Sequence, residues 1–485
     1  MKTKNLIVAL VVLLIPLGVG AQALKGSYFM DNSLNRNKMN PAFAPRTNYF
    51  QMPVFGNISG GMTSNLDIPT FRYSYKGDYV TFLSDQVSAK KLDRRLPAHP
   101  HFDAESSVNI INFGFFTPQH SFWTFDLGLR AGLDSDIPAG LFKSLKDGAG
   151  TSGKTYDIGN INAYVTASIQ ASIGYSRDII DGLRVGAKLR AIAPFSYIAL
   201  NLNDVRMTTG KDKWTMETEG HLYTVMQGLE VTPVEGEMIP DFSFDPDRML
   251  GNGALAGFGY AVDLGAEYVL NLPGKFFDGL SFSAAVTDLG LVHYKKSLVR
   301  SLGIKGNMEW EGVQNAGEGS QEYLTEVIDE FIGESEGNTR YDQEKASGLT
   351  RSTMPNIYLG VEMPFLKDMM SVGLLYSGRF SQSYYRNELT ASLNIVPAKW
   401  FAFGINYSFL NSARTIGSII EFTPNKGVNF FMGFDYMPLS YNRTDPALVP
   451  EFLQEMDFSD VDIPISWRMN CHLGLSFALG SKYGR

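Results

Sequence analysis

The residues with the sharpest chemical pattern are GAGTSGKT, 148–155, which fit the phosphate-binding loop G-x-x-x-x-G-K-[ST]. Such a loop holds nucleotide phosphates on backbone N–H groups and a lysine, between a buried strand and the start of a helix. Here the upstream residues LFKSLKDG are no buried strand, and downstream of Ile161 apolar and polar residues alternate as in a strand. We therefore predict that residues 148–155 form a loop between strands and bind no nucleotide.

Other residue types capable of catalysis or metal binding are sparse. His99, His101 and Asp103 lie close together in PAHPHFD, but no further ligand is obvious nearby, so we expect no metal site. No G-x-S-x-G segment marks a nucleophilic serine. The sequence therefore predicts no catalytic residue, no cofactor and no enzyme.

The remaining charged residues of interest lie on strands with alternating faces. In residues 161–175 every second residue is apolar, and those between are polar and uncharged. Such a strand is long for a soluble sheet, whereas a tilted strand needs about 9 to 11 residues to cross a bilayer. One face is therefore expected to meet lipid and the other a watery lumen.

The same alternation places several charges on the predicted luminal face. In LRVGAKLRAIA (183–193) and GYAVDLGAEYVL (259–270), the apolar residues share one face and the charges share the other. Two interpretations of these charges are open: they pair with one another across the lumen, which we favour, or they contact a substrate. The luminal candidates are Arg184, Lys188, Arg190, Asp263, Glu267 and Asp288.

These strands predict an all-β fold, a transmembrane antiparallel β-barrel of about 14 strands. Closed barrels and helices are the only structures that satisfy every backbone group in lipid, and no helical span is apparent after the first 21 residues. A secreted β-sandwich is the alternative, but its strands would be shorter and its outer face more polar. Pro194 leaves open whether residues 183–207 form one bent strand or two.

The N-terminus predicts export. Lys2 and Lys4 precede an apolar run that ends in small residues, which is typical of a signal peptide over residues 1–21, cleaved near Ala21 or Ala23. A membrane anchor is the alternative, but the apolar run is short for a span. Removing residues 1–21 leaves 40 basic and 50 acidic residues, a balance that argues against nucleic-acid binding.

Two segments do not fit the pattern of barrel strands. Residues 22–50 are rich in turn residues but also apolar, so we expect a plug inside the barrel mouth rather than a loose tail, ahead of a barrel over 51–485. An acidic insertion, residues 309–345 (303–350 with its flanks), includes a predicted amphipathic helix over 320–333. The helix either packs on the barrel rim, which we favour, or docks a partner protein through Tyr323, Leu324, Val327, Ile328 and Phe331.

Several stretches resemble a family of exported Bacteroidota barrels known only as a domain of unknown function. They are MNPAF (39–43), SIGYSRDIIDGLRVGAKLRAI (172–192), GFGYAVDLGAEY (257–268), LSFSAAVTDLGLVHY (280–294) and LTASLNIVPAKWFAFGINYSF (389–409). That family is distantly similar to the long-chain fatty-acid transporter (FadL-type) barrels and the PorV-type secretion barrel. The resemblance implies that Asn40, Pro41 and Ala42 belong to a plug in a fourteen-stranded barrel.

Two functional hypotheses follow. The first is a barrel of the outer membrane of a Gram-negative bacterium, surrounded by lipid, that passes or binds a small hydrophobic molecule. The second is a barrel that transports nothing and docks exported or surface proteins, for which the acidic insertion is the expected contact.

Overall fold

The computed structural model describes most of the chain. The described residues are 24–31, 33–76, 78–148, 152–232, 240–245, 247–248, 255–310, 336–337, 340–343, 347–366, 369–382, 384–398, 400–410, 413–425, 427–437, 441–442, 463–464 and 468–479. The predicted signal peptide and the helix over 320–333, with its proposed contact residues, lie outside these ranges.

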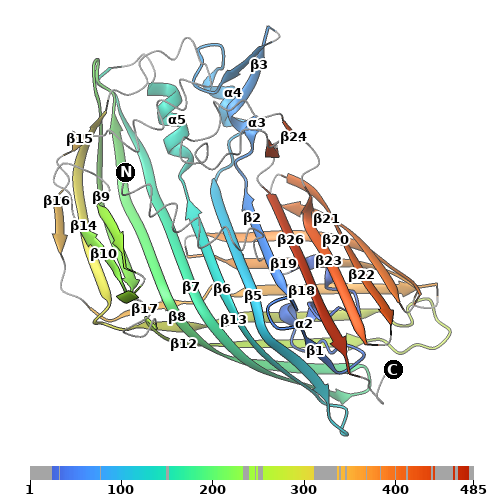
Figure 1. The fold of residues 1–485 in the computed structure, drawn as a ribbon. Helices are drawn as coiled ribbons and strands as arrows, with labels where there is room; N and C mark the ends of the chain where they lie inside the picture. The colour runs from blue at the N-terminus through green and yellow to red at the C-terminus, as the bar shows by residue number, and fades with distance from the viewer. Residues whose placement is uncertain are drawn as a thin grey trace.

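Fourteen antiparallel strand positions close into a barrel, as the alternating segments predicted (Figure 1). The fourteenth position is shared by two short strands, β1 and β2, which both pair with the first and last long strands and so close the wall. In wall order the strands are β5 (His101–Phe116), β6 (Phe122–Asp136), β7 (Thr155–Ile180), β8 (Leu183–Thr208), β12 (Gly257–Val269), β13 (Ser281–Tyr294), β18 (Asn356–Phe365), β19 (Met370–Phe380), β20 (Tyr385–Ala398), β21 (Phe401–Leu410), β22 (Ala413–Asn425), β23 (Val428–Met437) and β26 (Arg468–Ala478), followed by β1 (Tyr49–Gln51) and β2 (Ile58–Ser64).

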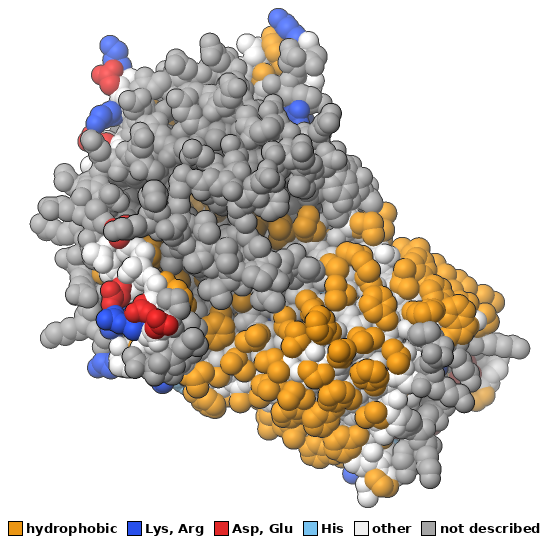
Figure 2. Space-filling view, in the orientation of Figure 1, with side chains coloured by type: hydrophobic (Ala, Val, Ile, Leu, Met, Phe, Trp, Pro, Cys, Tyr) orange, Lys and Arg blue, Asp and Glu red, His pale blue; other side chains and the backbone are white. Residues whose placement is uncertain are grey.

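Apolar side chains cover the outer wall of the lower barrel (Figure 2). Ile173 and Leu189, on the predicted lipid face, are 49% and 61% exposed, although both are large and apolar. Water would penalise so much apolar surface, whereas lipid favours it. In the part of the chain that the structure describes, no helix is both long and apolar enough to cross a bilayer.

The strands β7 and β8 rise far above this apolar band, and β8 changes partners at Pro194. Its lower half pairs with β12 up to Ile192, and its upper half pairs with β9 from Ser196 onward. Residues 183–208 are therefore one strand that forks the sheet, which settles the ambiguity that Pro194 created. The upper branch contains β9 (Trp214–Met226), β14 (Val299–Trp310), β15 (Glu336–Gly337) and β16 (Arg340–Gln343), and β17 (Leu349–Ser352) extends the wall beside β13.

A cap with its own apolar core sits against the upper branch (Figure 1). Phe82, Leu83 and Leu92 from the segment between β2 and β5 pack there with Met207 and Trp214 of the branch. The cap consists of α3 (Ile68–Phe71), β3 (Arg72–Tyr75), β4 (Asp78–Thr81), α4 (Ala89–Asp93) and α5 (Ala139–Gly148). Two further pairs of short strands form separate small sheets: β10 (Leu229–Thr232) with β11 (Asp241–Phe244), and β24 (Tyr441–Asn442) with β25 (Ile463–Pro464).

The cap also shows how the GAGTSGKT segment is placed. Helix α5 ends at Gly148 and strand β7 begins at Thr155, so the segment links a helix to a strand. A phosphate-binding loop requires the opposite order, with a strand before and a helix N-terminus after. The described residues 152–154 belong to no helix or strand, and the segment joins a helix to a strand rather than two strands as predicted. The ammonium group of Lys154 lies 4.5 Å from the ring centre of Tyr156.

Residues 24–48, which we call the luminal segment, lie inside the lower barrel (Figure 1). The described part of this segment, 24–31 and 33–48, contains two short helices, η1 (Lys25–Ser27) and α2 (Arg36–Met39). Tyr28, Phe29 and Phe43 form a small aromatic core with Tyr358 and Leu375 of the barrel wall. The segment is thus held by contacts with the wall rather than by regular structure of its own.

Candidate functional site

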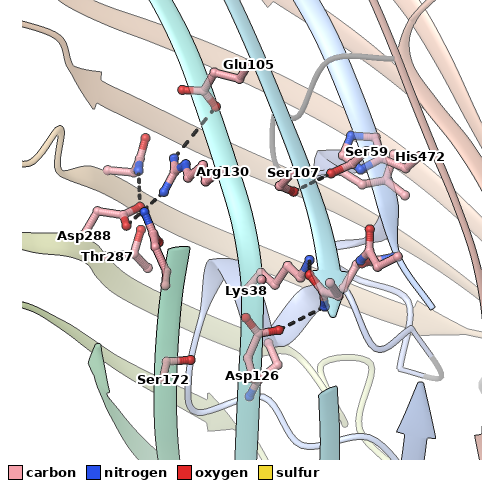
Figure 3. Close-up of a pocket in the computed structure, with 18 of the residues that line it drawn as sticks. Lys38, Ser59, Glu105, Ser107, Asp126, Arg130, Ser172, Thr287, Asp288 and His472 are labelled. Atoms are coloured by element: carbon pink, nitrogen blue, oxygen red, sulfur yellow. Dashed lines mark hydrogen bonds and ion pairs between the residues drawn. The ribbon is translucent and has the colours of Figure 1, made fainter. Parts of the chain in front are cut away.

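A cavity of about 160 Å³, the lower chamber, lies between the luminal segment and the inner wall (Figure 3). Its lining is mostly polar, because every second residue of the surrounding strands points inward. Figure 3 shows Arg130 between Glu105 and Asp288, and Lys38 beside Asp126. The chamber therefore presents charged groups to whatever molecule enters it.

The luminal segment is fixed at its start by a buried acidic cluster. The N–H groups of Lys25 and Gly26 donate to the two carboxylate oxygens of Asp435, each at 2.7 Å. The Lys25 ammonium forms an ion pair with Glu388 and lies 2.7 Å from the hydroxyl of Tyr436. All these groups are buried, so the contacts anchor the segment to β20 and β23.

The predicted plug residues Asn40, Pro41 and Ala42 are seated against β8 and β12. The Asn40 amide donates to the carbonyl of Ala266 at 3.1 Å, and its oxygen accepts from the N–H of Ala42 at 3.0 Å. A Cβ at Gly186 would lie 2.2 Å from the carbonyl oxygen of Pro41. The wall must therefore be glycine there to admit the Asn-Pro-Ala backbone so closely.

Three of the six charges predicted to face the lumen meet in one network. Arg190 of β8 pairs with Asp263 at 2.7 Å and also with Asp288. Arg130, which the sequence analysis did not single out, lies 3.1 Å from Asp288 and 3.8 Å from Glu105. We call this set the central ion-pair network; Arg379 joins it by pairing with Glu105.

Asp288 has a left-handed backbone, with φ of 58°. It lies at the irregularity where the pairing of β12 with β13 shifts register. Its N–H donates to Asp263 at 2.7 Å, and its carboxylate accepts from Asn356 at 3.1 Å. Aspartate tolerates this conformation better than most residues, and the surrounding contacts fix it with its carboxylate toward the arginines.

The other three predicted charges contact different partners. The Arg184 guanidinium donates to the Asp178 carboxylate at 3.0 Å near the lower rim. The Glu267 carboxylate lies 3.6 Å from the guanidinium of Arg36 in the luminal segment. Lys188 donates to the side chain and the carbonyl of Asn37. Inward orientation was predictable for all six, but their grouping depends on which strands face one another across the lumen.

Lys38 of α2 also faces the lower chamber and was not predicted. Its ammonium lies 3.2 Å from the Asn109 side-chain oxygen. Enclosure within the barrel lowers the pKa of Lys38 to about 8, while Asp126 opposes the shift and Lys188, Arg190 and Arg130 add to it. Lys38 is therefore charged at neutral pH but close to its titration range.

A second cavity of about 110 Å³, the upper chamber, adjoins the lower one. Glu105, Arg130, Gln170, Asp288 and Arg379 line both, so the central ion-pair network lies at their boundary. Above it the lining becomes more aromatic and aliphatic, through Tyr164, Tyr197, Tyr294, Ile192, Pro194 and Val292. The upper part of the lumen thus has more apolar lining than the lower part, although Asp134 and Arg351 add charges there as well.

Of the two histidines considered as metal ligands, His101 packs against an aromatic ring near the upper rim. His101 stacks on Tyr384, and Asp103 pairs with Arg386 at 2.9 Å. Among the residues that the structure describes, no group of three potential ligands could hold a metal ion.

Residues 41–435 match a family model described as "Family of unknown function (DUF5723)", and the chain belongs to this family. This confirms the resemblance to a domain of unknown function; the Bacteroidota origin and the PorV-type similarity stay predictions. No curated protein matches the chain.

Several solved barrels are similar in fold but distant in sequence. They include the Ralstonia pickettii toluene transporter TbuX (10% identity, 92% of this chain and 93% of that chain, TM-score 0.35), the Pseudomonas putida toluene transporter TodX (12%, 96% and 99%, 0.37) and a Pseudomonas aeruginosa FadL homologue (10%, 96% and 98%, 0.36). At these values the likeness decides nothing about ligand or mechanism.

Proposed function

We propose that this protein is an outer-membrane barrel that takes up a small molecule from outside and holds it above the luminal segment, which acts as a plug. The observation that carries the proposal is the pair of adjoining chambers between the upper rim and that segment. The apolar outer wall supports a bilayer location, and the short lower turns with long upper loops are typical of periplasmic and extracellular ends.

The lining supports a ligand that is largely hydrophobic but has a polar end. The tyrosines and aliphatic side chains of the upper chamber suit an apolar body, and the charges below suit a polar group. A wholly apolar molecule would have to displace water from the central ion-pair network without replacing its hydrogen bonds, which is costly.

Native mass spectrometry on barrel extracted gently from its own membrane tests this function. We expect a reproducible small-molecule mass that leaves on activation. Its loss in a variant with Tyr197 and Tyr294 both changed to Ala, compared with a control Phe276→Ala outside the lumen, would locate it in the upper chamber. A barrel that carries no small molecule but a stoichiometric protein would refute uptake and favour docking.

A further inference from the structure

The cations that line the lower chamber fall into two groups. Five have a carboxylate within ion-pair distance: Lys25, Arg130, Arg190, Arg379 and Arg386. Over the described ranges, Lys38 and Lys188 have none. This difference is informative, because enclosed ammonium groups are costly unless an anion compensates them.

The partners of the two lysines are neutral amides. Lys38 lies 3.2 Å from the Asn109 side-chain oxygen, and Lys188 lies 3.0 Å from that of Asn37. Two carboxylates are near these lysines, and both are engaged elsewhere. Asp126 accepts from Asn109 at 2.9 Å and from Asn112 at 2.7 Å, and Asp263, the cross-strand neighbour of Lys188, pairs with Arg190 at 2.7 Å. The two ammonium groups therefore have no carboxylate of their own.

Four buried side chains of the described lining have a polar atom without a protein partner. Two of these atoms can donate: the amide nitrogen of Asn35, and Nε2 of His472 when it carries the ring proton; both residues are 3% exposed. The other two, the amide oxygens of Asn57 and Asn112, are acceptors. Buried donors are normally satisfied, so the two donors indicate a group that accepts hydrogen bonds from the chamber side.

We propose that the lower chamber binds a small oxyanion, a carboxylate or phosphate group, held by Lys38 and Lys188 with Asn35 and His472 as additional donors. This inference rests on the proposed function, since the anion would be the polar end of the molecule taken up. A volume of about 160 Å³ is below the roughly 300–1,000 Å³ of sites that enclose a drug-sized ligand, so only a small anion or an anionic group fits.

The test is isothermal titration of the detergent-solubilised full barrel with inorganic phosphate and, separately, with acetate. We expect saturable binding of at least one probe, and the stronger one identifies the chemistry. Lys38→Met and Lys188→Met should each weaken that binding about tenfold or more, because each removes a charged hydrogen-bond donor. Lys305→Met is the matched control, since this lysine is exposed on the upper branch and pairs with Glu219.

Wild-type barrel that binds neither probe, or Met variants that bind as wild type does, would overturn the proposal. An equal loss in Lys305→Met would do the same, because it would reveal surface binding. Lys38→Arg and Lys188→Arg keep the charge and guard against misfolding; both should retain binding, and loss in both contradicts the assignment. A barrel that binds phosphate but carries no molecule from its membrane would refute uptake and leave the anion site standing.

Discussion

Replacing Lys25 with Met should loosen the luminal segment. The change leaves the Glu388 carboxylate enclosed without its cation, with side chains that are 8% and 2% exposed in the intact pair. Removing one partner of a buried ion pair costs about 3–5 kcal/mol. Because Tyr436 still donates to Glu388 at 2.6 Å, and Asp435 still accepts two backbone N–H groups, we take about 3 kcal/mol, the lower end of that range.

A cost of about 3 kcal/mol raises the detached population of the segment roughly a hundredfold. The assay is the rate of thiol labelling at Ser27→Cys in a Cys471→Ser background, because Ser27 is wholly buried and Cys471 is the chain's one native cysteine. When reclosing is faster than labelling, the rate follows the open population. Lys25→Met should label about a hundredfold faster than the parent.

The double variant Lys25→Met, Glu388→Met separates charge from packing. It leaves no enclosed charge unpaired, so its labelling should return most of the way to the parent rate. Lys305→Met, which breaks an exposed ion pair, should leave labelling unchanged. The reasoning is refuted if Lys25→Met labels at the parent rate, or if the double variant labels as fast as the single one.

Four other changes test separate parts of the structure. Deleting residues 24–45 should make cells permeable to a bulky probe, and unchanged uptake of that probe would count against the plug. Gly186→Ala should destabilise the attachment of Asn40–Ala42 to the wall by about 1–3 kcal/mol, because the new Cβ would collide with the Pro41 carbonyl. Faster proteolysis of the luminal segment would show this. Gly132→Ala is the control that should be tolerated, since the atom nearest to its Cβ would be 3.5 Å away. Asp288→Ala should lower the melting temperature more than Asp288→Asn, because asparagine keeps both the left-handed backbone and a hydrogen-bonding side chain; equal melting temperatures would contradict this. Acetate, which is fully ionised from pH 7 to 9, should bind more weakly as the pH rises through this range, since Lys38, with a pKa of about 8, loses its charge there. The slope should vanish in Lys38→Met, and a slope that persists would assign the titration to another group.

Much of the barrel wall was predictable because it depends on a local pattern. Alternation in 161–175 and 183–193 predicted which side chains face outward, and Ile173 and Leu189 are indeed exposed on the apolar wall. Strand ends were less predictable. β7 begins at Thr155 rather than at Ile161, since its upper part pairs with β8 above the apolar band and needs no lipid-facing side chains.

For each strand of the site, the sequence could predict which residues point inward, but not which of them meet those of other strands. Arg190 and Asp263 are direct consequences of alternation in β8 and β12, which are neighbours in the wall. Arg130 lies in the alternating segment FWTFDLGLRAG, so the same rule applied to 122–132 could have found it. Its position between Glu105 and Asp288 depends on closure of the barrel, which no local pattern contains.

The irregular luminal segment explains why the lower chamber keeps two lysines without carboxylates. The regular wall pairs charges on neighbouring strands, as Arg190 of β8 does with Asp263 of β12. The segment instead presents backbone carbonyls and amide side chains, such as Asn37, which bind Lys188 without neutralising it. In the proposed anion site, the segment would therefore add Lys38 to Lys188 and leave both charges available to an incoming anion, which a carboxylate in place of the Asn37 amide would cancel.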